Sequence, residues 1–228
     1  MSTKYIVPAG VRLFRALFRP VFRGIFHLLS KVEITGLENI PISGAYIIAI
    51  NHISLYDPPF MIAFWPVAPE SVGASDIWER TGQSMLARFY GGIPVHRGDY
   101  DRQVIERVLS VLDAGLPLLI APEGGRSHTP GMQRAMPGVA FIIEKADVPV
   151  MPVGVVGATQ DFLSRALRSE RPVLEMRIGK PIRLPPIEGK GDDRRTARQR
   201  NADSIMIHIA SLLPLEYRGV YGGQPNFT

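Results

Sequence analysis

The chain has 228 residues, of which 46% are hydrophobic and 21% are charged, and these values are typical of a globular protein. Its length allows one full hydrophobic core, with two domains possible. It contains no cysteine, which excludes disulfide bonds and thiolate metal sites and is compatible with a reducing compartment.

The net charge of +5 is unevenly distributed along the chain. Six basic residues and no acidic residue lie within positions 1–32, which leaves 20 basic and 21 acidic side chains for the remaining 196 residues. All of the excess positive charge therefore belongs to the N-terminal segment. This distribution argues against a general nucleic-acid-binding surface, so nucleic acid is not an expected partner.

The segment 8–30 predicts an amphipathic helix with an arginine face and an apolar face. Its four arginines fall within about 80° of one another on a helical wheel. Such a pattern is typical of a helix that lies in a membrane interface, because the arginines interrupt any apolar run long enough to span the bilayer. The expected membrane-binding residues are Arg12, Phe14, Arg15, Leu17, Phe18, Arg19 and Arg23, with the arginines facing anionic headgroups and the apolar side chains entering the bilayer. The alternative is a helix packed on the protein's own core. In either case Pro20 is expected to kink or divide it.

The rest of the chain alternates between predicted strands and predicted helices. Short apolar runs predict strands at 31–35, 45–50, 72–75, 93–96, 116–121, 148–156 and 173–178, the last near a sheet edge. Helices are expected at 59–65, 83–90, 99–115, 138–145 and 202–213, with Asp99 capping the third; residues 188–201 are expected to form a charged loop.

This alternation predicts an α/β fold, a three-layer sandwich with a mostly parallel central sheet. The N-terminal basic amphipathic segment, residues 1–31, would be an appendage on the membrane surface. Residues 32–228 would then form the catalytic domain.

A histidine and an aspartate mark the end of the strand at 45–50. His52 follows that strand directly, and Asp57 precedes Pro58 and Pro59, which is typical of a helix start with Asp57 as the cap. On one continuous helix the two side chains would diverge by about 140°, so only a turn allows them to meet. If they meet, the carboxylate can accept the proton of one imidazole nitrogen and leave the other free as a base. Alternatively, each residue has only a structural role.

Two further strand ends carry charged residues. Arg97 follows the strand at 93–96, and Glu123, Gly124 and Arg126 follow the strand at 116–121. Two arginines beside a glycine-containing turn suit a phosphate, which guanidinium groups can bind bidentately. Glu123 could orient a substrate hydroxyl or hold Arg126. The alternative is that both arginines form structural salt bridges.

Four motifs in order make the chain resemble the glycerolipid acyltransferases, a family that includes the lysophosphatidic acid acyltransferases. They are Asn51-His52-Ile-Ser-Leu-Tyr-Asp57, Gly92-Ile-Pro-Val-His-Arg97, Ala121-Pro-Glu-Gly-Gly-Arg-Ser127 and Val148-Pro-Val-Met-Pro-Val153. The chain departs from the family pattern at Ala121, where phenylalanine is usual, and at Gly125, where threonine is usual. Gly125 lacks the threonine hydroxyl that could contact the acceptor's phosphate, so the four motifs specify the reaction more closely than they specify the acceptor.

The resemblance implies transfer of a fatty acyl group from a thioester donor to the hydroxyl of lysophosphatidic acid, which makes phosphatidic acid in phospholipid synthesis. His52 would take the hydroxyl proton and Asp57 would orient the imidazole. The phosphate and acceptor site would consist of Arg97, Glu123, Gly124 and Arg126.

The expected co-substrate is acyl-CoA or acyl-acyl carrier protein, with no metal and no cofactor. Membrane phospholipids are expected partners, and the protein is expected to be peripheral or monotopic on the cytoplasmic face of the membrane. The alternatives are another acceptor, such as glycerol 3-phosphate or a glycolipid, a thioester hydrolase, or a non-catalytic lipid-binding protein of the membrane surface.

Overall fold

The structure is a computed structural model that describes residues 5–96, 101–127, 129 and 131–223. Within these ranges, seven strands form one sheet in the order β1-β7-β6-β2-β5-β3-β4. The strands are β1 (Lys31–Thr35), β2 (Ile47–Ile50), β3 (Glu70–Ala74), β4 (Ile93–Val95), β5 (Leu118–Ile120), β6 (Val150–Val156) and β7 (Val173–Ile178). The helices are α1 (Ala9–Leu29), α2 (Asp57–Phe64), α3 (Gln83–Tyr90), α4 (Arg102–Asp113), α5 (Gly138–Ala146), α6 (Phe162–Leu167) and α7 (Gly191–Leu212).

The sheet is mostly parallel, which confirms the predicted fold class. Strands β6, β2, β5, β3 and β4 run in one direction, and the pair β1–β7 runs in the other, because β7 pairs antiparallel with β6. Strand β7 lies next to the edge strand β1, as its alternating pattern indicates.

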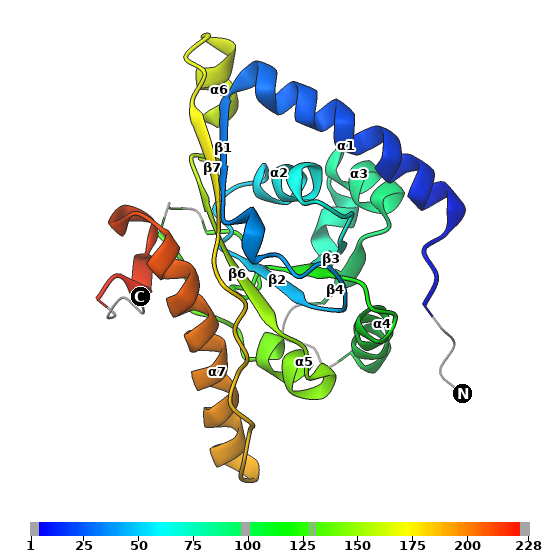
Figure 1. Ribbon diagram of the computed structural model, residues 1–228, viewed down its shortest axis with the longest axis vertical. Coiled ribbons are helices and arrows are strands. Elements are labelled where there is room, and N and C mark those ends of the chain that lie inside the picture. Colours follow the sequence, from blue (N-terminus) through cyan, green and yellow to red (C-terminus); the bar gives the residue numbers. More distant parts are fainter. Residues whose placement is uncertain (1–4, 97–100, 128, 130, 224–228) are drawn as a thin grey trace.

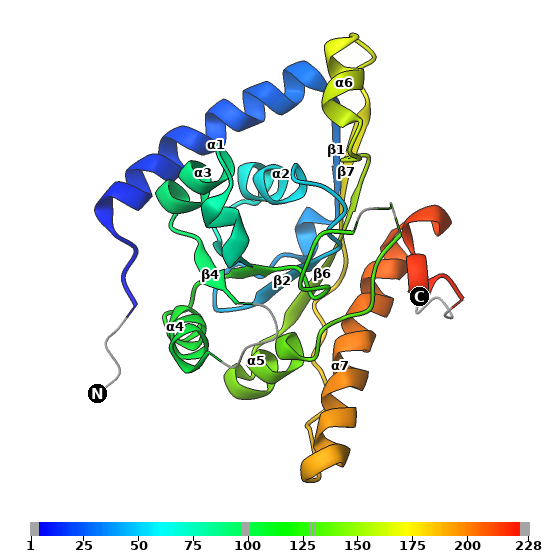
Figure 2. The same cartoon turned by 180° about the vertical axis from the view of Figure 1, so that it is seen from behind.

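Helices cover both faces of the sheet and complete the three layers (Figures 1 and 2). The four residues of β2 are all buried, and they alternate between two hydrophobic clusters. Ile47 packs in the cluster formed with α4, α5 and α7, whereas Ile48 packs in the cluster formed with α1, α2 and α3. This alternation is what a strand buried on both faces requires.

Helix α1 packs on the body of the protein with its arginine face turned inward. The guanidinium of Arg15 donates to both carboxylate oxygens of Glu70, at 2.5 and 2.8 Å, and Arg15 is only 4% exposed. Tyr5 donates a third hydrogen bond to the same carboxylate, and the Arg15 guanidinium lies over the ring of Tyr90. A buried ion pair with this many partners fixes the helix against β3 and α3.

Two more arginines of α1 cap the C-terminal end of α2. Arg23 donates to the carbonyl oxygen of Ala63 at 2.6 Å, and Arg19 donates to the carbonyls of Ile62 and Trp65. The last carbonyls of a helix lack partners within the helix and carry partial negative charge, so guanidinium groups stabilise them. The expectation that Arg15, Arg19 and Arg23 face lipid headgroups is therefore wrong; Arg12 alone among the four is exposed.

The aromatic side chains of α1 also face the protein. Phe18 is buried, and Phe14 stacks on both Phe18 and Phe89 of α3. The expectation that Phe18 enters a bilayer is accordingly wrong. The outer face of α1 instead carries five exposed apolar residues that we call the apolar stripe: Leu13, Leu17, Val21, Ile25 and Leu28. Pro20 does not divide the helix. Proline has no N–H to donate to the carbonyl of Ala16, but both residues face solvent, where water can replace the lost hydrogen bond.

Two other local predictions differ from the structure. The segment from Gly191 to Asn201 is helical and not a loop: Arg194 and Arg198, one turn apart, both pair with Glu144 of α5 and hold this part of α7 on the domain. Helix α4 is capped by Asp101, whose carboxylate accepts from Gln103 N and Val104 N, and Asp99 lies outside the described residues.

No helix within the described ranges is long and apolar enough to cross a membrane.

The Arg15–Glu70 pair generates a stability prediction. Replacing Arg15 by methionine leaves the buried carboxylate of Glu70 without its counter-ion, which we expect to lower the free energy of unfolding by about 3–5 kcal/mol. Replacing the exposed Arg12 by methionine on the same helix is the matched control and should change it by less than about 0.5 kcal/mol. Urea unfolding curves of the two variants measure the difference. Equal midpoints would contradict the packing of α1 described above.

Candidate active site

The site lies at the C-terminal ends of the two central strands β2 and β5. These two strands are parallel neighbours, with Ala49 opposite Ile120, so the turns that follow them meet at the same edge. In open α/β sheets this edge is where ligands usually bind. The first turn carries His52 and Asp57, and the second carries Glu123, Gly124 and Arg126.

His52 and Asp57 meet as the sequence predicts. The Nδ1 atom of His52 lies 3.0 Å from Oδ2 of Asp57, and the same oxygen accepts from the backbone N–H groups of Ile53 and Ser54, both at 2.8 Å. Asp57 is fully buried, whereas the His52 side chain keeps 17% of its surface exposed. The carboxylate is thus held inside the turn while the outer edge of the imidazole reaches solvent.

Asp57 does not cap α2 in the expected way. It is the first residue of the helix, and its side chain points back to the preceding turn, where it accepts from Ile53 N and Ser54 N. Pro58 and Pro59 follow in the first turn, as predicted. Asp57 therefore organises the turn that carries His52 and leaves the start of α2 to the prolines.

Asn51 fixes the start of the same turn. Its side-chain amide donates to the carbonyl of Val155 at 2.9 Å, and its side-chain oxygen accepts from Val155 N at 2.7 Å. This pair of hydrogen bonds extends the pairing of β2 with β6 by one residue through a side chain. The sequence motif contains Asn51, but a role in anchoring could not be deduced without knowing that β6 lies beside β2.

Glu123 ties the two turns together. One carboxylate oxygen accepts from His52 N at 2.8 Å, and the other accepts from Gln133 N at 2.7 Å. Burial raises the pKa of Glu123 to about 7, against the lowering effect of these two N–H donors. Of the two roles expected for Glu123, holding Arg126 does not match this geometry, because its two oxygens accept from His52 N and Gln133 N and it makes no ion pair with Arg126. Orienting a substrate hydroxyl stays a prediction.

The turn after β5 is completed by a glycine and a serine. Gly124 has φ of +69°, and a Cβ atom there would lie 2.9 Å from Cγ of Met136, so a larger residue would be strained and crowded. Ser127 N donates to the carbonyl oxygen of His52 at 2.8 Å. Together with the bond from His52 N to Glu123, this contact clamps the backbone of the histidine on both sides.

The structure describes only one of the two arginines that the sequence predicts to bind phosphate. Arg126 is half-buried on the β5 turn, and it makes no hydrogen bond or ion pair with another described residue. Arg97 lies outside the described residues. A phosphate-binding role for Arg126 and Arg97 stays a prediction.

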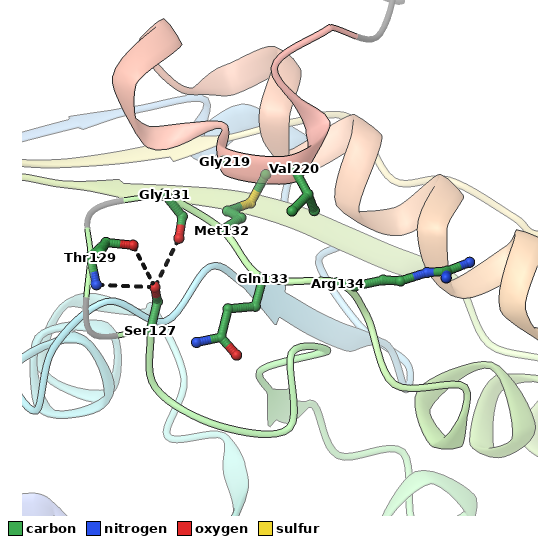
Figure 3. A pocket seen from close by; sticks show the side chains of 8 residues that line it. All are labelled: Ser127, Thr129, Gly131, Met132, Gln133, Arg134, Gly219 and Val220. Atoms are coloured by element: carbon green, nitrogen blue, oxygen red, sulfur yellow. Dashed lines mark hydrogen bonds between the residues drawn. The ribbon is translucent and has the colours of Figure 1, made fainter.

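A cavity of about 440 Å³ opens beside the clamped turn (Figure 3). Ser127 and Gln133 line it, and the 3₁₀ turn from Gly219 to Tyr221 closes its far side. Ser127 Oγ donates to the carbonyl of Gly131 at 2.9 Å, which joins these two lining residues directly (Figure 3). The sequence did not indicate this cavity, because Gly219 and Val220 of its wall are distant in sequence from Ser127.

A partly exposed histidine paired with a buried aspartate at the end of a parallel strand is the arrangement expected of an acid–base enzyme site. The sequence model of the family described as Acyltransferase matches residues 31–156 of this chain. The chain belongs to this family.

Similar proteins agree with this assignment. The chain is 26% identical over 171 residues to 1-acyl-sn-glycerol-3-phosphate acyltransferase alpha of Mus musculus, covering 71% of this chain and 56% of the mouse protein. It is 25% identical over 195 residues to the Homo sapiens protein of the same name, covering 83% of this chain and 67% of the human one. The chain thus spans between about half and two thirds of these relatives.

The fold also matches that of a solved structure. The crystal structure of the 1-acyl-sn-glycerophosphate (LPA) acyltransferase PlsC from Thermotoga maritima superposes with a TM-score of 0.60 at 20% sequence identity, covering 86% of this chain and 79% of that one. At this identity the similarity establishes a shared fold.

The raised pKa of Glu123 generates a prediction about stability and pH. Between about pH 4.5 and about pH 7 the folded chain binds more protons at Glu123 than the unfolded chain, so the free energy of unfolding falls as the pH rises through this interval. Glu123→Gln removes the titrating group, so the variant should lose less stability than the parent over the same interval.

Urea unfolding at several pH values within this interval measures the two slopes. Glu106→Gln, at an exposed position on α4, is the control and should keep the slope of the parent. Parallel curves for the parent and the Glu123→Gln variant would contradict the burial of a protonated carboxyl at this position.

Proposed function

We propose that the protein transfers a fatty acyl group from a thioester donor to the free hydroxyl of lysophosphatidic acid and so makes phosphatidic acid. The observation that carries this proposal is the 3.0 Å contact between His52 and Asp57 in a turn clamped by Glu123 and Ser127. The names of the similar mouse and human proteins support the choice of acceptor.

In this proposal each member of the pair has its own role. Asp57 accepts the Nδ1 proton of His52, which leaves Nε2 unprotonated and directed to the exposed side of the turn. As the acceptor oxygen attacks the thioester carbonyl, Nε2 takes the hydroxyl proton, and Asp57 stabilises the imidazolium that forms. When the tetrahedral intermediate collapses, the C–S bond breaks and the proton passes from Nε2 to the leaving sulfur. The products are an ester and a thiol.

The acceptor is held on the turn after β5. In this proposal Arg126 binds its phosphate, which its lack of an ion pair within the described residues supports, and the backbone at Gly124 lacks a Cβ atom that would block close approach. Glu123 contributes by fixing the histidine backbone, because its carboxylate already accepts from two N–H groups.

The membrane surface contacts the apolar stripe of α1, which contains Leu17 of the residues expected from the sequence. It does not contact Arg15, Arg19 and Arg23, which face the protein. Leu17 is 62% exposed and Leu28 is 76% exposed, although both are large and apolar. Exposed Phe89 of α3 and Leu167 of α6 lie on helices that pack beside α1, which widens the apolar area. A contiguous apolar surface of this kind marks an interaction site, and a lipid acceptor requires access to a bilayer. The protein is accordingly peripheral, with α1 lying in the interface.

The mechanism predicts the effect of removing the base. His52→Ala should lower acyl transfer to lysophosphatidic acid by about 10²–10⁴-fold, because it deletes the proton acceptor and leaves the backbone contact to Glu123 in place. His208→Ala on α7 is the matched control and should keep activity.

The measurement follows acyl transfer from acyl-CoA and from acyl carrier protein, with lysophosphatidic acid and glycerol 3-phosphate offered separately. A folded His52→Ala variant within a few-fold of the parent would contradict the mechanism. Preference of the parent for glycerol 3-phosphate would contradict the acceptor.

The apolar stripe predicts how the protein binds vesicles. Leu17→Gln combined with Val21→Gln should weaken binding to phosphatidylcholine vesicles at least about tenfold, because two apolar side chains no longer enter the bilayer. Ile42→Gln combined with Leu215→Gln is the control, since these residues are also exposed and apolar but lie away from α1. Flotation with vesicles measures the bound fraction. Binding that depends on anionic lipid and salt, but not on the stripe, would refute this arrangement.

A further inference from the structure

An arginine-lined cleft lies on the side of the sheet covered by α7. It has a volume of about 430 Å³ and is lined by Arg134, Pro137, Arg195, Thr196, Gln199, Arg200 and Asp203. We call it the arginine cleft. Its three arginines are exposed, and they come from two segments that are distant in sequence: the loop before α5 and the first half of α7.

The charges in the cleft are not balanced. Arg134 lies 3.4 Å from the carboxylate of Asp203, the single acidic residue among those lining the cleft. Asp203 also accepts from Tyr221 and Gln199, so its charge is already shared. The cleft therefore has an excess of positive charge.

The other two cleft arginines contrast with their neighbours on α7. Arg194 and Arg198 are neutralised by Glu144. Arg195 and Arg200 form no ion pair with any residue that the structure describes. Helix α7 thus directs one pair of arginines to the protein and another pair to solvent at the cleft.

The arginine cleft borders the cavity beside the active-site turn through Arg134. This residue also lines the cavity beside the clamped turn, together with Ser127 and Gln133. Ser127 N is hydrogen-bonded to His52, and Gln133 N is hydrogen-bonded to Glu123. In Figure 3 the side chain of Arg134 extends away from Ser127 toward α7.

The arginine cleft and the apolar stripe lie on opposite faces of the sheet. Helices α5 and α7 cover one face, and α1 covers the other (Figure 1). A ligand of the cleft therefore approaches from water when the stripe is on a bilayer. This placement separates it from the lipid acceptor and suits a water-soluble, anionic substrate.

We propose that the arginine cleft binds the nucleotide phosphates of an acyl-CoA donor, with the pantetheine arm lying in the cavity beside Gln133 and the thioester at His52. The proposal rests on the acyl transfer proposed above and names the donor of that same site. Guanidinium groups bind phosphates bidentately, and Thr196 and Gln199 add polar groups to the wall. A concave site of this volume fits a small molecule, whereas a folded carrier protein needs a broad interface.

Binding of CoA without turnover tests the site directly. Arg195→Gln combined with Arg200→Gln should raise the Kd for free CoA at least about tenfold and reduce its dependence on salt, because two guanidinium–phosphate contacts are lost. Arg102→Gln combined with Arg107→Gln on α4 removes the same charge from the same face of the sheet and should leave the Kd unchanged. An unchanged Kd in the first double variant would overturn the proposal.

Steady-state kinetics then identify the donor. The Arg195/Arg200 double variant should have a raised KM for acyl-CoA, an unchanged KM for the acceptor and unchanged turnover of an S-acyl pantetheine, which carries no phosphate. If the double variant loses only the reaction with acyl carrier protein, the assignment to CoA is wrong. If the parent transfers to no lysophospholipid while CoA binding still requires the two arginines, the proposed acceptor fails and the nucleotide site stands.

Discussion

The buried carboxylate of Glu123 holds together the two turns on which the active site depends. One turn follows β2 and carries the histidine, the other follows β5, and each would be free to move if the strands alone positioned it. By accepting from His52 N and Gln133 N, Glu123 joins both turns to the loop that borders the cavity. Its burial in a site that also contains Asp57 raises its pKa, so the geometry of the histidine and the protonation of Glu123 are physically coupled.

The N-terminal helix is an integral part of this arrangement. Its arginines pair with Glu70 and cap the end of α2, whose first residue is Asp57. The helix that begins at Asp57 is therefore fixed at its C-terminal end by α1. The apolar stripe on the outside of α1 and the His–Asp pair are connected through a single short helix.

In the proposed arrangement, one face of the sheet is turned to lipid and the other to water. The apolar stripe covers one face, and the arginine cleft lies on the other. His52 lies at the C-terminal end of β2, where the turns after β2 and β5 meet. The proposed transfer of an acyl group from a water-soluble donor to a lipid requires access from both sides, and turns that leave from the same ends of parallel strands are compatible with it.

The sequence by itself determined the alternation of strands and helices, the class of fold and the meeting of His52 with Asp57. These features depend on local patterns: apolar runs of strand length, and a five-residue separation that only a turn can close. Tertiary structure decided which way α1 faces, because arginine binds a buried carboxylate or helix-end carbonyls as well as it binds a phosphate. It also decided that Gly191–Asn201 is helical, since Glu144 pairs with Arg194 and Arg198 from a different part of the chain. The roles of Asn51 and Glu123 required the neighbours of β2 in the sheet, β6 and β5, and strand order is set by packing that no single stretch of sequence contains.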